Sequence, residues 1–135
     1  MADKTTSATI EENGKSPYAV SIRVSGFEIA GDEPVSFGGG DTGPAPYDLL
    51  TAALGECTSM TVRWYAIQKN WPLEKVTVQL THHKDENKKD IFVKDVQVFG
   101  SALSDEQRAK LIEVAGKCPV QRTLENGAVV QSLKP

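Results

Sequence analysis

The amino-acid sequence predicts one domain that combines strands and helices, and three observations lead to this prediction. A chain of 135 residues suits a single domain with a modest core, so we expect residues 1–135 to form one domain. Apolar and polar residues alternate, as is typical of strands, in the first thirty residues and again after residue 75. Two other segments carry apolar residues at helical spacing, and one of them is long.

The N-terminal strands are expected to form a small β-meander. Residues 1–7 are polar and are predicted to be disordered. Alternation begins at Ala8 and stops at Asn13-Gly14, a hairpin signal; a second run covers residues 18–25 and a third begins at Phe27.

A long helix is predicted to begin at Pro46, which suits a first helical turn because its missing N–H is not needed there. Asp48 complements the positive end of the helix dipole. The run stops at Asn70-Trp71-Pro72, since a residue before proline resists the helical conformation. The helix is therefore about 22 to 24 residues long.

Cys57 lies in the middle of an apolar stripe on this helix. A stripe this wide must be covered on most sides, and a second subunit is a natural supplier of the cover. The residues that share the stripe with the thiol are Leu50, Ala53, Leu54, Met60, Thr61 and Trp64.

Two further strands and a second helix are expected to follow. The strands cover residues 76–83 and 92–99, and a charged loop joins them. Ser104 and Gln107 form a capping box that starts a helix ending at Cys118-Pro119, and Pro119 is placed to start one more turn. Val129 and Val130 are interpreted as a last short strand.

Composition and charge exclude several classes of partner. The formal net charge is −3 and the basic residues are interleaved with acids, so we expect no nucleic-acid partner. No apolar run approaches the roughly 20 residues of a membrane span, and the first residues lack the apolar core of a signal peptide. We therefore expect a cytoplasmic protein with reduced, catalytic or redox-sensing cysteines.

Cys57 and Cys118 are the only two cysteines, and they differ in position. A free cysteine is often inert packing, and an apolar environment alone opposes the reactive thiolate. Cys57 lies inside its helix, so a cation must supply the activation; Cys118 lies at a helix end and also before the turn that starts at Pro119. The two lie 61 positions apart, and the sequence does not show whether they meet.

Other chemistry is weakly supported. A zinc site from Cys57, Cys118 and His82 lacks the short ligand spacings of such sites, and an acyl-transfer site from Cys57 and His82 lacks a nucleophile signature. The glycine run at residues 38–40 is not followed by the residues of a phosphate-binding loop. We predict neither a metal nor a cofactor.

Several motifs resemble the OsmC/Ohr family, the osmotically inducible and organic hydroperoxide resistance proteins. They are GGGDTGPAPYDLLTAALGECTSMTVRWYA, NWPLEKVTV and LSDEQRAKLIEVAGKCPVQRTL, within a match over residues 17–133. The resemblance implies an α+β fold, the OsmC-like fold, in which two chains intertwine around central cysteine helices. It also implies that Cys57 attacks an organic hydroperoxide, releasing an alcohol, that Cys118 resolves the sulfenic acid as a disulfide, and that a dithiol reductant resets the pair.

The chain departs from the peroxidase branches of that family at three places. Those branches have a glutamate directly after the helix-opening proline, whereas the acid in this chain is Asp48, one position later and rotated by about 100°. Asp48 would reach a thiol only across a dimer interface; otherwise it is a first-turn partner of the helix dipole. Gln121 stands where relatives often have histidine.

The thiolate-stabilising arginine of these branches has no clear counterpart. Arg23 is near in sequence but lies on the polar face of its strand, where we expect it to be solvated or paired with an acid. Arg63 lies off the stripe of the thiol.

Two hypotheses about function follow. The first is a dimeric, cytoplasmic thiol-dependent peroxidase that acts on organic hydroperoxides. The alternative is an OsmC-like protein without efficient peroxidase activity, in which the dimer groove binds a small apolar ligand or partner and the cysteines are redox-passive. The displaced acid and the missing arginine motivate this alternative.

Overall fold

The computed structural model describes residues 4–133. The chain divides into two compact units, residues 1–50 and 51–135, and the boundary in the sequence falls within its longest helix. Of the segment predicted to be disordered, residues 1–3 lie outside the described residues, and residues 4–7 are exposed and form neither helix nor strand. The prediction that the whole chain is one domain stays a prediction.

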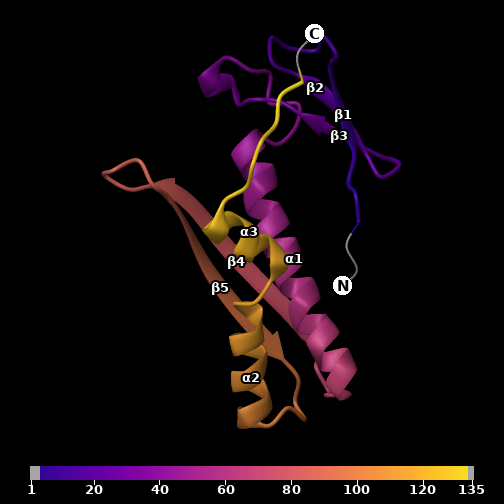
Figure 1. Cartoon of the computed structure of the whole chain (residues 1–135), viewed down its shortest axis with the longest axis vertical. Coiled ribbons are helices and arrows are strands. Elements are labelled where there is room, and N and C mark those ends of the chain that lie inside the picture. Colours follow the sequence, from indigo (N-terminus) through magenta and orange to yellow (C-terminus); the bar gives the residue numbers. More distant parts are fainter. Residues whose placement is uncertain (1–3, 134–135) are drawn as a thin grey trace. The chain divides into compact units, whose positions relative to one another are not determined.

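The N-terminal unit holds a three-stranded antiparallel sheet in the order β1 (Ala8–Glu12), β2 (Val20–Val24), β3 (Phe27–Gly31) (Figure 1). The predicted meander is therefore confirmed. Ser25 and Gly26 join β2 to β3 in a two-residue turn with φ of 51° and 83°. Positive φ at both positions suits the right-handed twist of the two strands.

The loop after β3 is organised by a buried carboxylate that the sequence analysis missed. Asp32 is 3% exposed and accepts hydrogen bonds from the hydroxyls of Ser16 and Thr42 and from the amides of Glu33, Gly40 and Thr42. Burial alone would raise the pKa of Asp32, but these hydrogen bonds outweigh it and hold the pKa well below its ordinary value of 3.8. The loop contains the 3₁₀ turn η1 (Val35–Phe37) and leads into the long helix.

Asp32→Asn is expected to destabilise the chain, because an amide group replaces one acceptor oxygen with a donor that faces other donors. The folded-state pKa of Asp32 is depressed, so its stabilisation is present above pH 3.8 and is lost as the pH falls below that value. Denaturant unfolding of the wild type and the variant between pH 7 and pH 2.5 measures the difference in stability, which should narrow below pH 3.8.

The matched control is Asp41→Asn, which changes an exposed carboxylate in the same loop. Its unfolding midpoint should stay at the wild-type value throughout the pH range. Equal losses in the two variants would show that the charge of the loop, and not the buried hydrogen bonds of Asp32, is responsible.

The long helix α1 (Pro46–Lys69) agrees with the prediction at both ends. At its start, the amide of Ala45 donates to Asp48 Oδ2 at 2.9 Å. At its end, Asn70 has a φ of 56°, and the amide of Trp71 donates to the carbonyl of Ala66 at 2.9 Å, closing the helix as a Schellman motif does. Its buried side chains recur every fourth residue, at Leu54, Thr58, Val62 and Ala66.

In the C-terminal unit, the hairpin of β4 (Lys75–Lys84) and β5 (Asp90–Phe99) runs beside α1 (Figure 1). Leu80 approaches Gly55 of α1 so closely that an added Cβ there would lie 2.8 Å from the Leu80 side chain. Helix α2 (Asp105–Ala115) packs on β5 and begins at the predicted Ser104–Gln107 capping box. The core consists of Val62, Ala66, Leu73, Val98, Leu103, Leu111 and Ala115.

After α2 the chain forms α3 (Pro119–Asn126), which confirms the turn expected at Pro119. The short strand predicted at Val129 and Val130 is wrong, because both residues are almost fully exposed and belong to no strand. β-Branched residues form a strand only where a neighbouring strand supplies hydrogen-bond partners, and none pairs with them among residues 4–133.

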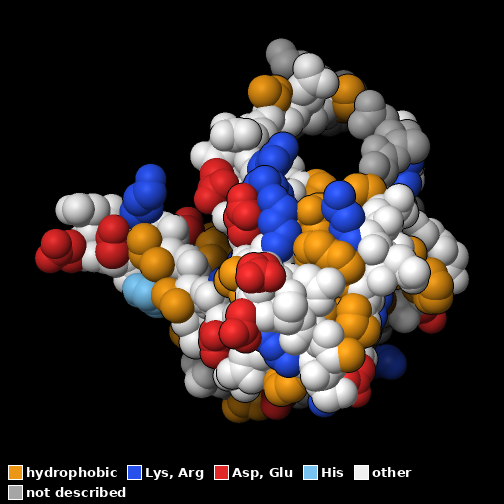
Figure 2. Space-filling view, turned by 90° about the horizontal axis from the view of Figure 1, so that it is seen from below, with side chains coloured by type: hydrophobic (Ala, Val, Ile, Leu, Met, Phe, Trp, Pro, Cys, Tyr) orange, Lys and Arg blue, Asp and Glu red, His pale blue; other side chains and the backbone are white. Residues whose placement is uncertain are grey.

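Acidic and basic side chains are both present on the surface drawn in Figure 2. No helix within residues 4–133 is both long enough and apolar enough to span a bilayer.

Candidate active site

The two cysteines, 61 positions apart in sequence, come together in the C-terminal unit. Both are unbonded thiols, and they are close enough for a hydrogen bond between their sulfurs. Cys57 comes from the middle of α1 and is half-buried, whereas Cys118 directly precedes α3 and is fully buried. An approaching molecule therefore meets Cys57 first.

Backbone amides in the first turn of α3 donate to both sulfurs. Cys118 is the N-cap of this helix, and its Sγ accepts the amide of Gln121 at 3.2 Å. The amide of Val120 donates to the sulfur of Cys57. Because α2 already ends at Ala115, the relevant helix end at Cys118 is the positive end of α3, which favours a thiolate, and not the negative end of α2.

A lysine lies beside the pair, on β5. Lys94 Nζ donates to Thr58 Oγ1 at 3.0 Å, to the carbonyl of Ala115 at 2.8 Å and to Gln121 Oε1 at 2.6 Å. Burial lowers the pKa of Lys94, and the nearby thiols and Glu125 offset part of that effect. All three acceptors are neutral, so they orient the ammonium group without cancelling its charge.

Sequence reasoning missed Lys94, although one signal was present. Lys94 lies on the inward face of β5, together with Phe92, Val96 and Val98. A lysine at such a position must find polar partners inside the fold, because an unpaired ammonium group is costly to bury.

The two thiols titrate as a pair, and their environments differ. Burial raises the pKa of Cys57, and Cys118 raises it further because two adjacent thiolates repel; Val120 and Thr61 offset only part of this. Burial also acts to raise the pKa of Cys118, but the Gln121 amide, the Cys57 thiol, the Thr58 hydroxyl and Lys94 together lower it below its ordinary value. The first negative charge of the pair is thus favoured on Cys118.

Thr61 contributes a hydroxyl at the edge of the site. Its Oγ1 is buried and makes no hydrogen bond of ordinary geometry with the described residues. It nevertheless lies close enough to Cys57, one helical turn away, to lower the pKa of that thiol. Thr61 is therefore positioned to donate to a Cys57 thiolate.

Both candidate arginines bind groups other than the thiols. Arg23 lies 3.8 Å from Glu11 and 3.7 Å from Glu28 on the N-terminal sheet, which confirms the expected pairing with acids. Arg63 donates to the carbonyl of Leu73 at 2.7 Å. Asp48 accepts a backbone amide at the start of α1, which supports its first-turn role, and its action across a dimer interface stays a prediction.

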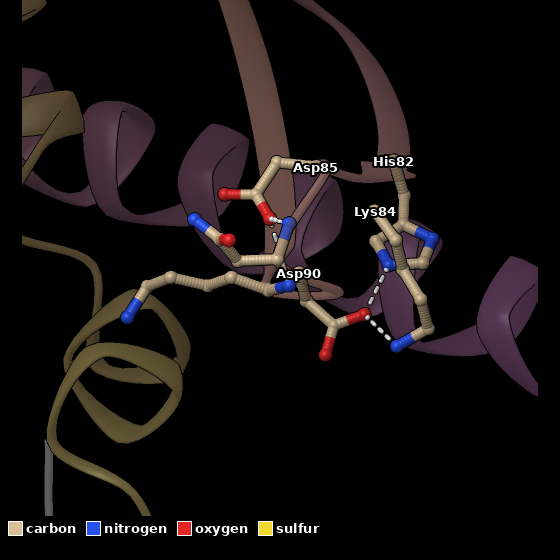
Figure 3. A network of polar contacts seen from close by, with 6 residues as sticks. His82, Lys84, Asp85 and Asp90 are labelled. Carbon is tan, nitrogen blue, oxygen red and sulfur yellow. Dashed lines mark hydrogen bonds and ion pairs between the residues drawn. The ribbon is translucent and has the colours of Figure 1, made fainter.

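His82 is engaged away from the thiols. Its Nε2 lies 2.8 Å from Asp90 Oδ1, which also accepts from Lys84 Nζ at 2.7 Å, as Figure 3 shows. The hydrogen bonds from Lys84 and His82 lower the pKa of Asp90. Within residues 4–133, no three His, Cys, Asp or Glu side chains converge on a point that would hold a metal ion.

The apolar stripe predicted around Cys57 is only partly buried. The buried face of α1 is centred on Thr58, the residue after Cys57, and not on Cys57 itself. The side chains of Met60 and Trp64 therefore remain 60% and 51% exposed. Beside them lies a cavity of about 390 Å³. Its lining consists of Ser59, Met60, Arg63, Trp64, Ile67 and Val76.

This chain is similar to known proteins in sequence and in fold. The family model described as OsmC-like protein matches residues 38–132. An OsmC-like protein from Mycoplasma pneumoniae has a similar solved structure, with a TM-score of 0.75 and 20% identity over 92% of this chain and 89% of that chain. No curated protein sequence matches significantly.

Solved structures of organic hydroperoxide resistance proteins are also similar. The protein OsmC of that description from Legionella pneumophila has a TM-score of 0.66 at 19% identity, covering 92% of this chain and 91% of that chain. OhrB of Bacillus subtilis has a TM-score of 0.61 at 20% identity, covering 89% and 90%. At these identities the likeness establishes the fold, so the predicted α+β, OsmC-like architecture is confirmed.

Proposed function

Since this chain belongs to the OsmC-like protein family, we propose that it is a thiol-dependent peroxidase that reduces organic hydroperoxides to alcohols. The observation that carries the proposal is the meeting of Cys57 and Cys118 beside Lys94 and the first amides of α3. A peroxidatic cysteine needs a stabilised thiolate, and a resolving cysteine must lie within reach of it.

The different exposure of the thiols supports their assignment. Cys57 is the more accessible of the two and attacks the hydroperoxide, becoming a sulfenic acid as the alcohol leaves. Cys118 is buried behind it and condenses with the sulfenic acid to form a disulfide. An external dithiol then reduces the disulfide, in a reducing compartment such as the cytoplasm.

A second candidate function has one observation in its favour. The raised pKa of Cys57 is what a redox-passive cysteine would show, and the cavity beside Met60 and Trp64 would then hold a small apolar ligand. The lowered pKa of Cys118 argues against passivity, because the pair loses its first proton more readily than an ordinary buried thiol.

Incubation of the reduced protein with cumene hydroperoxide distinguishes these functions. A peroxidase should produce one equivalent of cumyl alcohol while both thiols disappear, and a dithiol should make the reaction catalytic. If neither alcohol nor thiol loss is observed, the peroxidase proposal is rejected in favour of the ligand-binding one.

The exposed apolar side of α1 supports a dimer. Met60, Trp64 and Ile67 leave a contiguous apolar surface on one helix, which a second copy of the chain would cover. Light scattering should then give twice the chain mass of 14.6 kDa. A monomer at micromolar concentration would exclude this arrangement.

A further inference from the structure

The cation at the thiol pair is a lysine on a strand of the C-terminal unit. Arg23 and Arg63 bond to other groups, whereas Lys94 is held between Thr58 of α1 and Gln121 of α3. These two residues also flank the sulfurs, because Thr58 follows Cys57 in sequence and the amide of Gln121 binds Cys118. Two of the three residues that orient Lys94 thus lie beside the sulfurs.

We propose that Lys94 is the positioning residue of the thiol pair, holding its negative charge on Cys118 at rest, so that Cys118 accepts the proton of Cys57 when a hydroperoxide arrives. This inference rests on the proposed function for its chemistry. It gives Cys118 a task before the disulfide step.

The surroundings of Lys94 support this role. Its three hydrogen-bond acceptors are a hydroxyl, a carbonyl and a side-chain amide, and the Glu125 carboxylate acts on the ammonium group only as a nearby charge. The nearest acid on α3, Glu125, is bound by the Gln121 side-chain amide at 3.2 Å. The Gln121 side chain therefore links the two charged groups, because its oxygen accepts from Lys94 and its nitrogen donates to Glu125.

The reaction involves both thiols and one hydroperoxide molecule. The Cys57 proton moves to the Cys118 thiolate, and the Cys57 thiolate attacks the terminal oxygen of ROOH, forming an S–O bond as the O–O bond breaks. The leaving alkoxide takes the proton from Cys118 and departs as ROH. The restored Cys118 thiolate attacks the sulfenic sulfur, the S–S bond forms, and the released hydroxide takes a proton from solvent. The peroxide is reduced by two electrons and the two cysteines are oxidised.

The location of the charge is tested first with Lys94 unchanged. Thiolate absorbance at 240 nm is titrated in Cys57→Ser and in Cys118→Ser. We expect the Cys118 thiolate of Cys57→Ser to appear at lower pH than the Cys57 thiolate of Cys118→Ser. The reverse order, or equal titrations, would overturn the inference.

The role of Lys94 is then tested in the Cys57→Ser background. Lys94→Met should raise the apparent pKa of Cys118 by about one unit, which slows its alkylation by iodoacetamide at pH 7 about tenfold. Lys94→Arg should restore most of the rate. Lys75→Met, an exposed lysine on the neighbouring strand, removes the same charge and should leave the rate unchanged.

Circular dichroism of each variant reports whether it is folded, and an unfolded Lys94→Met leaves the decision to the two single-cysteine titrations. Lys94→Met that reacts like Lys75→Met overturns the inference even if the wild type reduces hydroperoxides. If the wild type does not reduce hydroperoxides but the shift is observed, the proposed function fails and the placement of charge stands.

Discussion

Cys57→Ser is expected to lower the rate of cumene hydroperoxide reduction by about three orders of magnitude or more, because a serine hydroxyl remains protonated and is a poor nucleophile toward oxygen. The measurement is the initial rate of alcohol release from reduced protein in the presence of a dithiol. The substitution removes one sulfur from a half-buried position, so the fold should be retained.

Cys118→Ser is the matched comparison, because it changes the same atom in the other half of the pair. This variant should consume one equivalent of hydroperoxide, more slowly than the wild type because Cys118 no longer accepts the Cys57 proton, and stop as a sulfenic acid, which dimedone traps on Cys57. If Cys57→Ser formed the trapped adduct and Cys118→Ser did not, the two roles would have to be exchanged.

Leu111→Ala should cost about 2 to 5 kcal/mol in the free energy of unfolding, since a large side chain is removed from a closed core. Leu111 has no exposed surface and joins α2 to the residues of α1 and β5 in one apolar cluster. Urea unfolding followed by circular dichroism measures the loss.

The neighbouring Ile112 provides the control. It lies on the same helix but is 44% exposed, so Ile112→Ala removes less buried surface and places a better helix former at that position. Its effect should be well below that of Leu111→Ala. Similar losses at the two positions would mean that α2 does not pack with Leu111 facing the core.

The elements were predictable where their signals are local. Pro46, Asn70 and the Ser104–Gln107 pair mark helix ends through contacts within one or two turns, and the structure has those ends. The strand expected at Val129 failed because a strand depends on a partner elsewhere in the chain, which no local pattern reveals.

The site was predictable only in part. The motifs singled out both cysteines, and the turn at Pro119 was recognised, but the sequence left open whether the sulfurs meet. The strand pattern marks Lys94 as a lysine on an inward face, but its place beside the thiols depends on three acceptors from α1, the end of α2 and α3, which the sequence does not bring together. The buried Asp32 was missed for the same reason, since its donors come from two separate loops, at Ser16 before β2 and at Thr42 after β3.

The separation of the two thiols along the chain has a thermodynamic consequence. A bond between Cys57 and Cys118 would close a loop of about 60 residues, and the chain-entropy relation assigns such a loop about 4 kcal/mol of stabilisation through the smaller freedom of the unfolded chain. The oxidised protein should therefore unfold at a higher denaturant concentration than the reduced one. By the same linkage, the disulfide is harder to reduce in the folded chain than in the unfolded chain, and the difference in free energy equals the stability that the disulfide adds to the fold.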